Sequence, residues 1–256
     1  MKVLQAERLS IAFGGLRAVD TVTLSVDSGQ VFSIIGPNGS GKTTLFNLVS
    51  GIYRADDGQI WLDGEPVTGL SPHDLARKGL SRTFQNLQIF SRMSVLENVM
   101  VGRHRHETTG VLADLVHWPS VTRQNRATRA AAFTALARVG LADHAHRSAG
   151  SLAYGEARRL EIARALAGKP SLLLLDEPAA GMNERETEEL GDTIRASRKL
   201  LEAMVIVEHD VAMMRGLADR LVVMDAGHKI AEGKPGEVLA EPNVIEAYLG
   251  TDEADE

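Results

Sequence analysis

The stretch Gly36-Pro37-Asn38-Gly39-Ser40-Gly41-Lys42-Thr43-Thr44 decides the fold of this chain. It follows the apolar run Val31–Ile35 and leads into the apolar-periodic segment Leu45–Val49, which predicts a strand, a loop and a helix in that order. The spacing G-x-x-x-x-G-K-[ST] in this context is typical of a phosphate-binding loop. The alternative is a glycine-rich turn without a ligand, and the adjacent Lys-Thr pair argues against it.

Each part of the loop has a chemical reason. Glycines allow the backbone to turn so that successive N–H groups point at an anion, and the positive end of the following helix adds to that field. We expect Lys42 to reach the β- and γ-phosphates of a nucleotide, and the Thr43 hydroxyl is placed to bind Mg²⁺. The loop therefore predicts a site for a nucleoside triphosphate and a magnesium ion.

The composition of the chain excludes several classes of protein. Its 256 residues are 44% hydrophobic and 24% charged, which is typical of a globular protein with a sizeable core. A net charge of −6 argues against a nucleic-acid binder with a broad basic face. No apolar run approaches a membrane span, Met1 to Gly15 lacks a signal-peptide pattern, and the absence of cysteine excludes disulfides and thiolate chemistry. We therefore expect a protein that stays in the cytoplasm.

Strand and helix patterns surround the loop. Val3–Ala6 and Thr21–Val26 alternate apolar and polar residues, which predicts antiparallel strands before the loop. Gly58–Gly64 predicts a short strand closed by an Asp-Gly turn. Later in the chain, short apolar runs separated by helical patterns predict buried parallel strands at Leu172–Leu175, Met204–Val207 and Leu221–Met224.

A helical insert interrupts this α/β pattern. Ser94–Glu97 is a capping box, Thr122–Val139 has helical spacing, and no convincing strand occurs from Ser94 to Ala167. We expect one domain, in which residues 1–84 and 159–250 form the α/β core with a β subdomain, residues 85–158 a helical subdomain, and residues 251–256 an acidic, disordered tail. His104 and His106 could bind a metal in principle, but without a complete ligand set a solvated surface is the better interpretation.

The acidic pair Asp176-Glu177 directly follows the predicted strand Leu172–Leu175. Ligands of an open parallel sheet bind beyond the carboxyl ends of its strands, so we expect this pair to face the phosphate-binding loop. Asp176 fits a magnesium ligand, directly or through water, and Glu177 fits the base that accepts a proton from an attacking water. The alternative is a pair of solvated acids, and the presence of the loop weakens it.

The order of these motifs resembles the nucleotide-binding subunit of an ATP-binding cassette transporter. The resemblance covers Val3 to Leu249 and rests on the phosphate-binding loop together with Gln85, Leu152–Glu156, Leu172–Glu177 and His209. It implies an α/β P-loop NTPase with a mostly parallel RecA-like core, an antiparallel β subdomain and an inserted α-helical subdomain. It also implies that the chain binds ATP and Mg²⁺ and hydrolyses ATP.

The resemblance gives roles to residues outside the loop. Phe13 stands where the family stacks an aromatic ring on adenine, and Val19 adds an apolar contact. Gln85 is similar to the glutamine that contacts Mg²⁺ or the attacking water and links nucleotide state to the transporter. His209 resembles the switch histidine that hydrogen-bonds the γ-phosphate. The resemblance thus implies the catalytic residues Glu177, His209 and Gln85 and the magnesium-binding residues Thr43, Gln85 and Asp176.

The segment Leu152-Ala153-Tyr154-Gly155-Glu156 resembles the family's signature motif but departs from its commonest form, Leu-Ser-Gly-Gly-Gln. Ala153 replaces the serine, Tyr154 the first glycine and Glu156 the glutamine. Gly155 and the following helix still offer backbone N–H groups to a phosphate, whereas the missing hydroxyl removes a hydrogen bond of about 1–3 kcal/mol. In the family, this segment of one copy closes over ATP held by a second copy, so we expect a dimer.

Four further segments, together with the variant signature, are similar to the ATPases of branched-chain amino acid importers. They are Arg158–Arg164, Pro178–Asn183, Val207–Asp210 and Val244–Gly250. The resemblance implies the energy-coupling ATPase of an importer for branched-chain or other hydrophobic amino acids. The partners it implies are a second ATPase subunit, membrane-spanning permease subunits and, through the permease, a substrate-binding protein, with no nucleic acid. The place it implies is the cytoplasmic face of the inner membrane.

Three alternatives stay open at this point. An ATPase of the same class could serve another cargo, such as urea, amides or lipopolysaccharide, because the cassette does not contact the cargo. A soluble cassette protein acting on ribosomes or DNA usually brings a second cassette, a coiled coil or a basic extension, which we do not see in this sequence. A small-molecule kinase would need neither the Gly155 segment nor the paired acids before Pro178. The cargo, the direction of transport and the identity of the second subunit are left open.

Overall fold

The computed structural model describes residues 1–103 and 119–252, and these residues fall into two units. The first unit contains residues 1–85, 171–180 and the chain from Leu201 onward, and the second contains residues 86–170 and 181–200. The predicted boundary after residue 158 lies inside helix α6 (Tyr154–Ala167), which packs against other helices of the second unit. Helix α7 (Glu184–Ser197) also belongs to the second unit and not to the α/β core.

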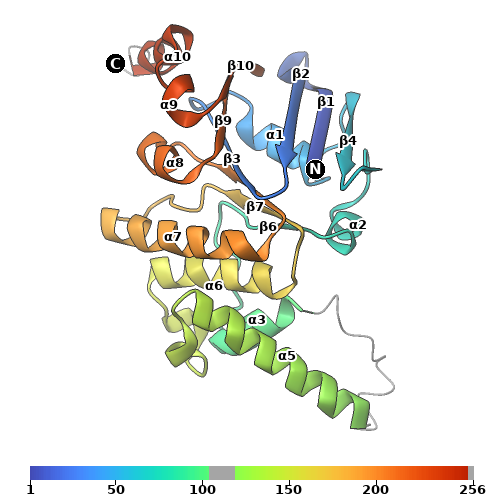
Figure 1. The fold of residues 1–256 in the computed structure, drawn as a ribbon, viewed down its shortest axis with the longest axis vertical. Coiled ribbons are helices and arrows are strands. Elements are labelled where there is room, and N and C mark those ends of the chain that lie inside the picture. The colour runs from blue at the N-terminus through green and yellow to red at the C-terminus, as the bar shows by residue number, and fades with distance from the viewer. Residues whose placement is uncertain (104–118, 253–256) are drawn as a thin grey trace. The chain divides into compact units, whose positions relative to one another are not determined.

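A six-stranded sheet in the order β10-β9-β3-β8-β7-β6 forms the centre of the first unit (Figure 1). Strand β3 pairs in parallel with β8 and β9, β7 pairs in parallel with β6 and β8, and β10 pairs antiparallel with β9. The strands are β3 (Gln30–Ile35), β6 (Leu80–Arg82), β7 (Leu172–Asp176), β8 (Ala203–Val207), β9 (Arg220–Asp225) and β10 (His228–Gly233). The predicted parallel strands are confirmed. The sequence patterns did not predict strands β6 and β10. Strand β6 is only three residues long, and β10 mixes charged and apolar residues, so neither has a clear strand pattern.

A second sheet of the first unit has the order β2-β1-β4-β5 and is antiparallel throughout its described pairs. Its strands are β1 (Lys2–Phe13), β2 (Leu16–Asp27), β4 (Asp57–Leu62) and β5 (Glu65–Pro66). The predicted antiparallel β subdomain is therefore confirmed, with strands longer than the alternating segments suggested. Strands β1 and β2 extend to a two-residue turn at Gly14-Gly15, where both glycines have positive φ angles.

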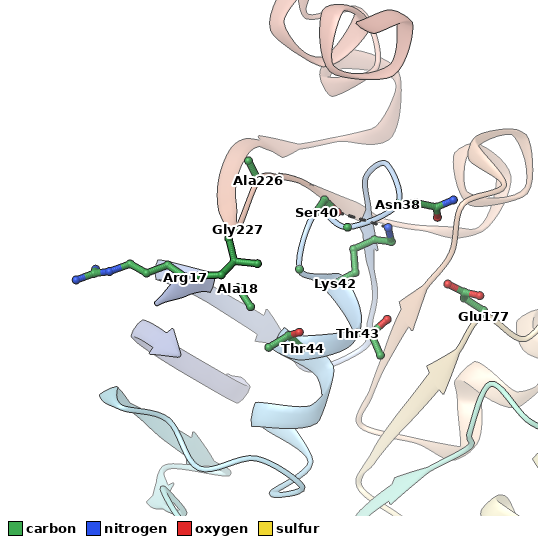
Figure 2. Close-up of a pocket in the computed structure, with 13 residues that line it drawn as sticks. Arg17, Ala18, Asn38, Ser40, Lys42, Thr43, Thr44, Glu177, Ala226 and Gly227 are labelled. Atoms are coloured by element: carbon green, nitrogen blue, oxygen red, sulfur yellow. Dashed lines mark hydrogen bonds between the residues drawn. The ribbon is translucent and has the colours of Figure 1, made fainter. Parts of the chain in front are cut away.

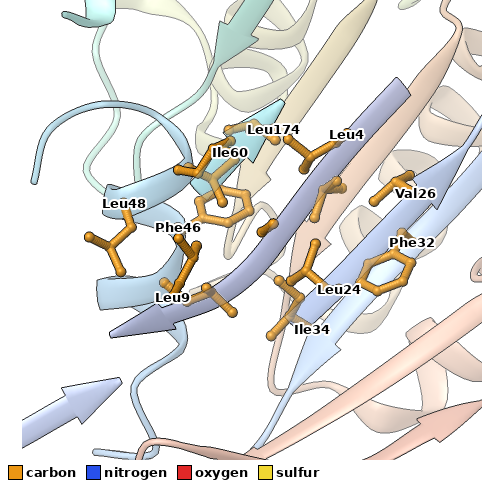
Figure 3. Packing of buried hydrophobic residues seen from close by; sticks show 14 of the residues in the cluster. Leu4, Leu9, Leu24, Val26, Phe32, Ile34, Phe46, Leu48, Ile60 and Leu174 are labelled. Atoms are coloured by element: carbon orange, nitrogen blue, oxygen red, sulfur yellow. The ribbon is translucent and has the colours of Figure 1, made fainter. Parts of the chain in front are cut away.

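Helix α1 (Lys42–Val49) shares one hydrophobic core with both sheets of the first unit (Figure 3). Phe46 of the helix, Leu9 and Ile60 of the antiparallel sheet, and Ile34 and Leu174 of the parallel sheet are all buried in this cluster. Burial of such side chains contributes about 1.5–3 kcal/mol each. This packing holds the N-terminus of α1, and the loop before it, at the carboxyl end of β3.

Helices build the second unit. Helix α3 (Val95–Val101) begins at the predicted capping box, in which Ser94 and Glu97 bond each other's backbone N–H groups. It packs with α5 (Pro119–Arg138) and α6, and α7 packs against α6 (Figure 1). Val99, Leu136 and Leu160 lie in their shared core. The histidines 104 and 106 lie outside the described residues.

Short helices complete the described chain: α2 (Pro72–Arg77), α8 (Val211–Leu217), α9 (Pro235–Val238), α10 (Pro242–Asp252) and single 3-10 turns at Ala142–His144, Ala149–Ser151 and Arg198–Leu200. Thr251 and Asp252 of the predicted acidic tail end helix α10, and residues 253–256 lie outside the described residues. No helix in the described ranges has the length and apolar character that a membrane crossing requires.

A buried ion pair lies inside the second unit. The Arg158 and Glu161 side chains are almost completely buried and approach to 3.2 Å, and Arg164 lies 3.8 Å from the other Glu161 oxygen. Glu161 also accepts a hydrogen bond from the backbone N–H of Gln88. Burial raises the pKa of Glu161, and the two arginines oppose this shift.

Replacing Arg158 with methionine is expected to lower the free energy of unfolding by about 3–5 kcal/mol, toward the lower end because Arg164 remains near the carboxylate. The Glu161 charge would stay buried without its nearer partner. Chemical denaturation measures the loss. The double variant Arg158→Met/Glu161→Leu should recover most of it, because no uncompensated charge is left. Equal losses in the single and double variants would contradict this account.

Candidate active site

A pocket of about 430 Å³ lies over the phosphate-binding loop of the first unit (Figure 2). It combines the loop with one acidic residue that follows β7, with the start of β2, and with the turn between β9 and β10. The lining residues are Leu16, Arg17, Ala18, Asn38, Gly39, Ser40, Gly41, Lys42, Thr43, Thr44, Glu177, Ala226 and Gly227. The sequence-predicted loop and Glu177 are thus brought together in one pocket.

The glycines of the loop stand where no side chain fits. Gly36 has a φ of +153°, and a Cβ there would lie 2.1 Å from the Met224 carbonyl oxygen. Gly41, which precedes α1, has a φ of +96°, and its Cβ would lie 2.3 Å from the Ala18 carbonyl oxygen. Glycine alone tolerates both the backbone conformation and this close approach. The loop is therefore held tightly between β2 and the end of β9, with its concave backbone facing the pocket.

Lys42 is buried within the curve of this loop. Its ammonium group donates hydrogen bonds of 2.7 Å to the carbonyl oxygens of both Gly36 and Pro37, and it lies 3.4 Å from the Ser40 hydroxyl. Burial lowers the pKa of Lys42, and the negative charge of Glu177 opposes this shift. A phosphate oxygen would compete with the two carbonyl groups for a cation that is already positioned in the loop.

Glu177 enters the pocket from the end of β7, on the side opposite Arg17 (Figure 2). Its φ angle of +43° is in the left-handed region, and its backbone N–H bonds to the Val207 carbonyl oxygen at 2.9 Å. Gln85 donates a 2.7 Å hydrogen bond from Nε2 to the Glu177 carboxylate. Strained backbone is common where a side chain must be aimed at a reacting group. Two of the three predicted catalytic residues are therefore in direct contact.

Asp176 precedes Glu177 but occupies a different environment. Its carboxylate is almost fully buried, does not line the pocket, and forms a 2.6 Å ion pair with Arg82 at the end of β6. Sequence reasoning did not identify Arg82, because no local motif marks it. The pairing fixes the orientation of the Asp176 carboxylate at the carboxyl end of the parallel sheet.

His209 follows β8, and its side chain is 62% exposed and outside the pocket lining. The preceding residue, Glu208, is completely buried. Glu208 accepts hydrogen bonds from the backbone N–H groups of Ala179 (2.8 Å) and His209 (3.1 Å), and its carboxylate lies 3.6 Å from the His209 ring. Burial raises the pKa of Glu208, and the backbone donors oppose the shift. Glu208 thus ties the loop after Glu177 to the start of the His209 segment.

Replacing Glu208 with glutamine is expected to lower the free energy of unfolding by about 1–3 kcal/mol, since one acceptor oxygen becomes an NH₂ group facing a backbone donor. Hydrogen exchange at the Ala179 and His209 amides should become faster, and the exchange rates of both amides can be measured in the folded protein. The matched control is Glu237→Gln, at an exposed position of α9. Unchanged exchange at both amides would show that Glu208 does not hold these segments.

At the adenine end of the predicted site, Phe13 and Val19 lie outside the pocket lining. Phe13 is half exposed and packs edge-to-face on Tyr53, with ring centroids 5.3 Å apart, but it does not line the pocket. Val19 is fully buried in the core and offers no surface to a ligand. The pocket is lined there by Leu16, Arg17 and Ala18 at the start of β2, which sequence reasoning did not identify.

The turn Ala226-Gly227 between β9 and β10 also lines the pocket unexpectedly. The Gly227 N–H donates to the Ser40 carbonyl oxygen at 3.1 Å, and the Gly227 carbonyl accepts from the Asp20 N–H at 2.9 Å. The Tyr248 hydroxyl on α10 is enclosed against the backbone of Gly36, and burial raises the pKa of Tyr248 to about 12. The only local signal for these contacts was the Gly of a tight hairpin turn.

The predicted signature segment lies in the second unit, at the start of α6. Ala153 occupies the N-cap position without a side-chain hydrogen bond, and the Glu156 carboxylate accepts from the Ala153 backbone N–H at 2.9 Å. The Tyr154 hydroxyl accepts a 3.0 Å hydrogen bond from Arg158, whose guanidinium lies over the Tyr154 ring. A Cβ on Gly155 would lie 3.1 Å from the Glu186 carboxylate. Close packing of α6 on α7 is thus a structural reason for this glycine.

The donor set fits Mg²⁺ only in company with phosphate oxygens. No cluster of three or more acidic or histidine side chains suited to a metal occurs in the part of the chain that the structure describes. Mg²⁺ is usually held by one or two protein oxygens together with nucleotide phosphates and water. The Thr43 hydroxyl in the first turn of α1 and the Asp176 carboxylate are oxygen ligands of the type that Mg²⁺ prefers.

Two family profiles match the chain. The ABC transporter profile matches residues 19–180, and the profile described as branched-chain amino acid ATP-binding cassette transporter matches residues 228–254. The first match spans more than half of the chain and both predicted nucleotide-binding motifs. The chain belongs to the ABC transporter family. It is an ABC ATPase, and the inferred resemblance is confirmed.

Relatives of this ABC ATPase match over nearly the full length of both chains. It is 45% identical over 249 residues to the high-affinity branched-chain amino acid transport ATP-binding protein BraF of Pseudomonas aeruginosa, covering 97% of this chain and 98% of BraF. Identity to LivG of Escherichia coli, which carries the same description, is 42% with the same coverage. The crystal structure of the ADP conformation of MJ1267, an ATP-binding cassette of an ABC transporter, superimposes with a TM-score of 0.85 at 33% identity, covering 98% of this chain and 99% of MJ1267.

Proposed function

We propose that this ABC ATPase is the energy-coupling subunit of an importer for branched-chain amino acids and works on the cytoplasmic face of the inner membrane. The observation that carries the proposal is the joint presence of an assembled ATP pocket and a C-terminal segment, residues 228–254, that matches the branched-chain amino acid cassette profile. BraF and LivG, which are described as transport ATP-binding proteins for these amino acids, support the choice of cargo.

The pocket supports a division of roles among its residues. Lys42 and the loop N–H groups bind the phosphates, and Thr43 and Asp176 would hold Mg²⁺, which when bound neutralises phosphate charge during transfer to water. Glu177 accepts the proton of the attacking water, and Gln85, which already contacts its carboxylate, orients that water. His209 stands at the end of β8 and would reach the γ-phosphate by a change of side-chain conformation.

A second ATPase subunit completes the proposed site. Helix α6 begins after Ala153, whose side chain offers no cap hydrogen bond, and the positive end of a helix favours an anion. In the proposed head-to-tail dimer, this end of one subunit closes over ATP bound by the other. Membrane-spanning permease subunits would receive the resulting motion, and a substrate-binding protein would deliver the amino acid to them.

The test is assembly and transport. The chain is produced together with candidate membrane subunits, purified from detergent-solubilised membranes, and reconstituted in vesicles with a substrate-binding protein. ATP-dependent accumulation of labelled leucine, isoleucine or valine is the expected result. Accumulation of urea, an amide or a lipid would leave the assignment as a transport ATPase intact but would refute branched-chain amino acids as the cargo. Failure to copurify with any membrane subunit would refute the role in transport.

A further inference from the structure

Arg82 occupies an unusual position between the two elements that carry the proposed magnesium ligands. It is the last residue of β6, and its side chain is 7% exposed. Its Nη2 atom donates to the Asp176 carboxylate at 2.6 Å. The same guanidinium turns its other terminal nitrogen toward helix α1, whose first turn carries Thr43.

The contacts with α1 are all at its C-terminal end. Nη1 of Arg82 donates to the Asn47 side-chain oxygen at 2.7 Å and to the Ser50 hydroxyl at 2.5 Å, and lies 3.4 Å from the Phe46 carbonyl oxygen. Carbonyl groups at a helix C-terminus carry partial negative charge, so a cation is favoured there. A single guanidinium therefore joins the end of α1 to the end of β7.

Two aromatic rings hold the guanidinium in place. The Phe46 ring lies 5.1 Å and the Phe84 ring 5.2 Å from the central guanidinium carbon of Arg82. Cations are attracted to ring faces at such distances, and the attraction grows where water is excluded. Only arginine offers a planar fork that can bond two groups at once while it is packed against rings, and lysine cannot reproduce this arrangement.

We propose that Arg82 is a positioning residue for the magnesium site: by joining α1 to β7, it sets the separation of the Thr43 hydroxyl from the Asp176 carboxylate. This inference rests on the proposed function, in which these two groups hold Mg²⁺ beside the nucleotide. The residue does not line the pocket. It acts by holding Oδ2 of Asp176, which fixes the direction of that carboxylate.

Removal of such an outer partner commonly costs 10–100-fold in metal affinity while the first ligands remain present. The expected signature of Arg82 is therefore a selective loss of the magnesium-dependent part of nucleotide binding. A residue that merely stabilised the fold would lower nucleotide affinity to the same extent with and without the metal. This difference separates positioning from general stability.

The experiment compares the wild type with Arg82→Met, Arg82→Lys and the control Arg220→Met, which removes an exposed ion pair to Glu232 in the same unit. Calorimetry measures the affinity for a non-hydrolysable ATP analogue in EDTA and in Mg²⁺, and electron paramagnetic resonance measures Mn²⁺ binding to the protein–nucleotide complex. For Arg82→Met we expect an affinity within about twofold of wild type in EDTA and metal binding weakened about 10–100-fold. The metal affinity of Arg82→Lys should lie between those of wild type and Arg82→Met, and the metal affinity of Arg220→Met should equal that of wild type.

Metal binding by Arg82→Met equal to that of wild type would overturn the inference, as would an equal loss of nucleotide affinity in EDTA and in Mg²⁺. If Arg82→Met does not fold, Arg82→Lys decides by the same two comparisons, because it keeps the buried charge of Asp176 paired. In both cases a wild type that hydrolyses ATP with Mg²⁺ leaves the proposed function intact. A wild type that binds the analogue without any metal dependence would overturn the proposed magnesium site and this inference together.

Discussion

Replacement of Lys42 with alanine is expected to lower the affinity for ATP by about 100-fold or more. In the structure the ammonium is held between the carbonyl oxygens of Gly36 and Pro37 and lies within the charge field of Glu177. Two charge-assisted hydrogen bonds to phosphate, each worth about 1.5–3 kcal/mol, correspond to that loss. Isothermal titration calorimetry with ATP measures it directly.

The loop itself should also loosen in this variant. Alanine cannot satisfy the Gly36 and Pro37 carbonyl groups, so the amides around them should exchange hydrogen faster. Lys78→Ala is the matched control, because Lys78 pairs with Glu65 at the surface and lies outside the pocket lining. An ATP affinity of Lys42→Ala equal to that of the control would refute the assignment of the phosphate-binding loop.

Local patterns predicted the framework of the pocket because each depends on neighbours in sequence. The loop of Gly36 to Thr44 needs a strand before it and a helix after it, and both are encoded within a few residues on each side. The buried run Leu172–Leu175 places Glu177 beyond the carboxyl end of a parallel strand, where ligands of such sheets bind. Family resemblance, and not spacing, assigned Gln85 to the site, and its hydrogen bond to Glu177 became known only from the structure.

The contacts that lie beneath the pocket were not predictable in the same way. Arg82 and Asp176 are 94 positions apart and meet only because β6 joins β7 at the edge of the sheet. In the sequence, nothing distinguishes Glu208 from other polar residues that follow a strand. Its role as an acceptor for the Ala179 and His209 backbone N–H groups is evident only in the structure. Such residues are specified by tertiary packing, for which a single sequence offers no periodic signal.

The two units of the structure have other boundaries than the predicted subdomains for a related reason. The amphipathic pattern of α7 shows that one face is buried but does not say which element covers it. In the structure, Leu190 and Ile194 of that face are buried, and the helix packs on α6, so that it belongs with the helical unit. Contacts of α6 likewise place the whole helix, beyond Arg158, in that unit.

Replacement of Glu177 with glutamine should abolish turnover while ATP binding remains. The variant keeps the size and shape of the side chain, and its amide oxygen can still accept the 2.7 Å hydrogen bond from Gln85. It loses the ability to take a proton from water, and loss of general-base catalysis lowers rates by about 10²–10⁴-fold. Steady-state phosphate release measures the rate, and calorimetry measures the retained affinity.

The same variant tests whether hydrolysis separates two subunits. If ATP closes a head-to-tail dimer and hydrolysis opens it, Glu177→Gln with ATP and Mg²⁺ should accumulate as a dimer in size-exclusion chromatography coupled to light scattering, whereas wild type should return to monomer as ATP is consumed. Glu7→Gln, at an exposed position of β1, should behave as wild type. Near-normal hydrolysis by purified Glu177→Gln would assign the base elsewhere. A monomer with full ATP occupancy would keep Glu177 as base but remove the proposed role of Gly155 and α6 in closing the site.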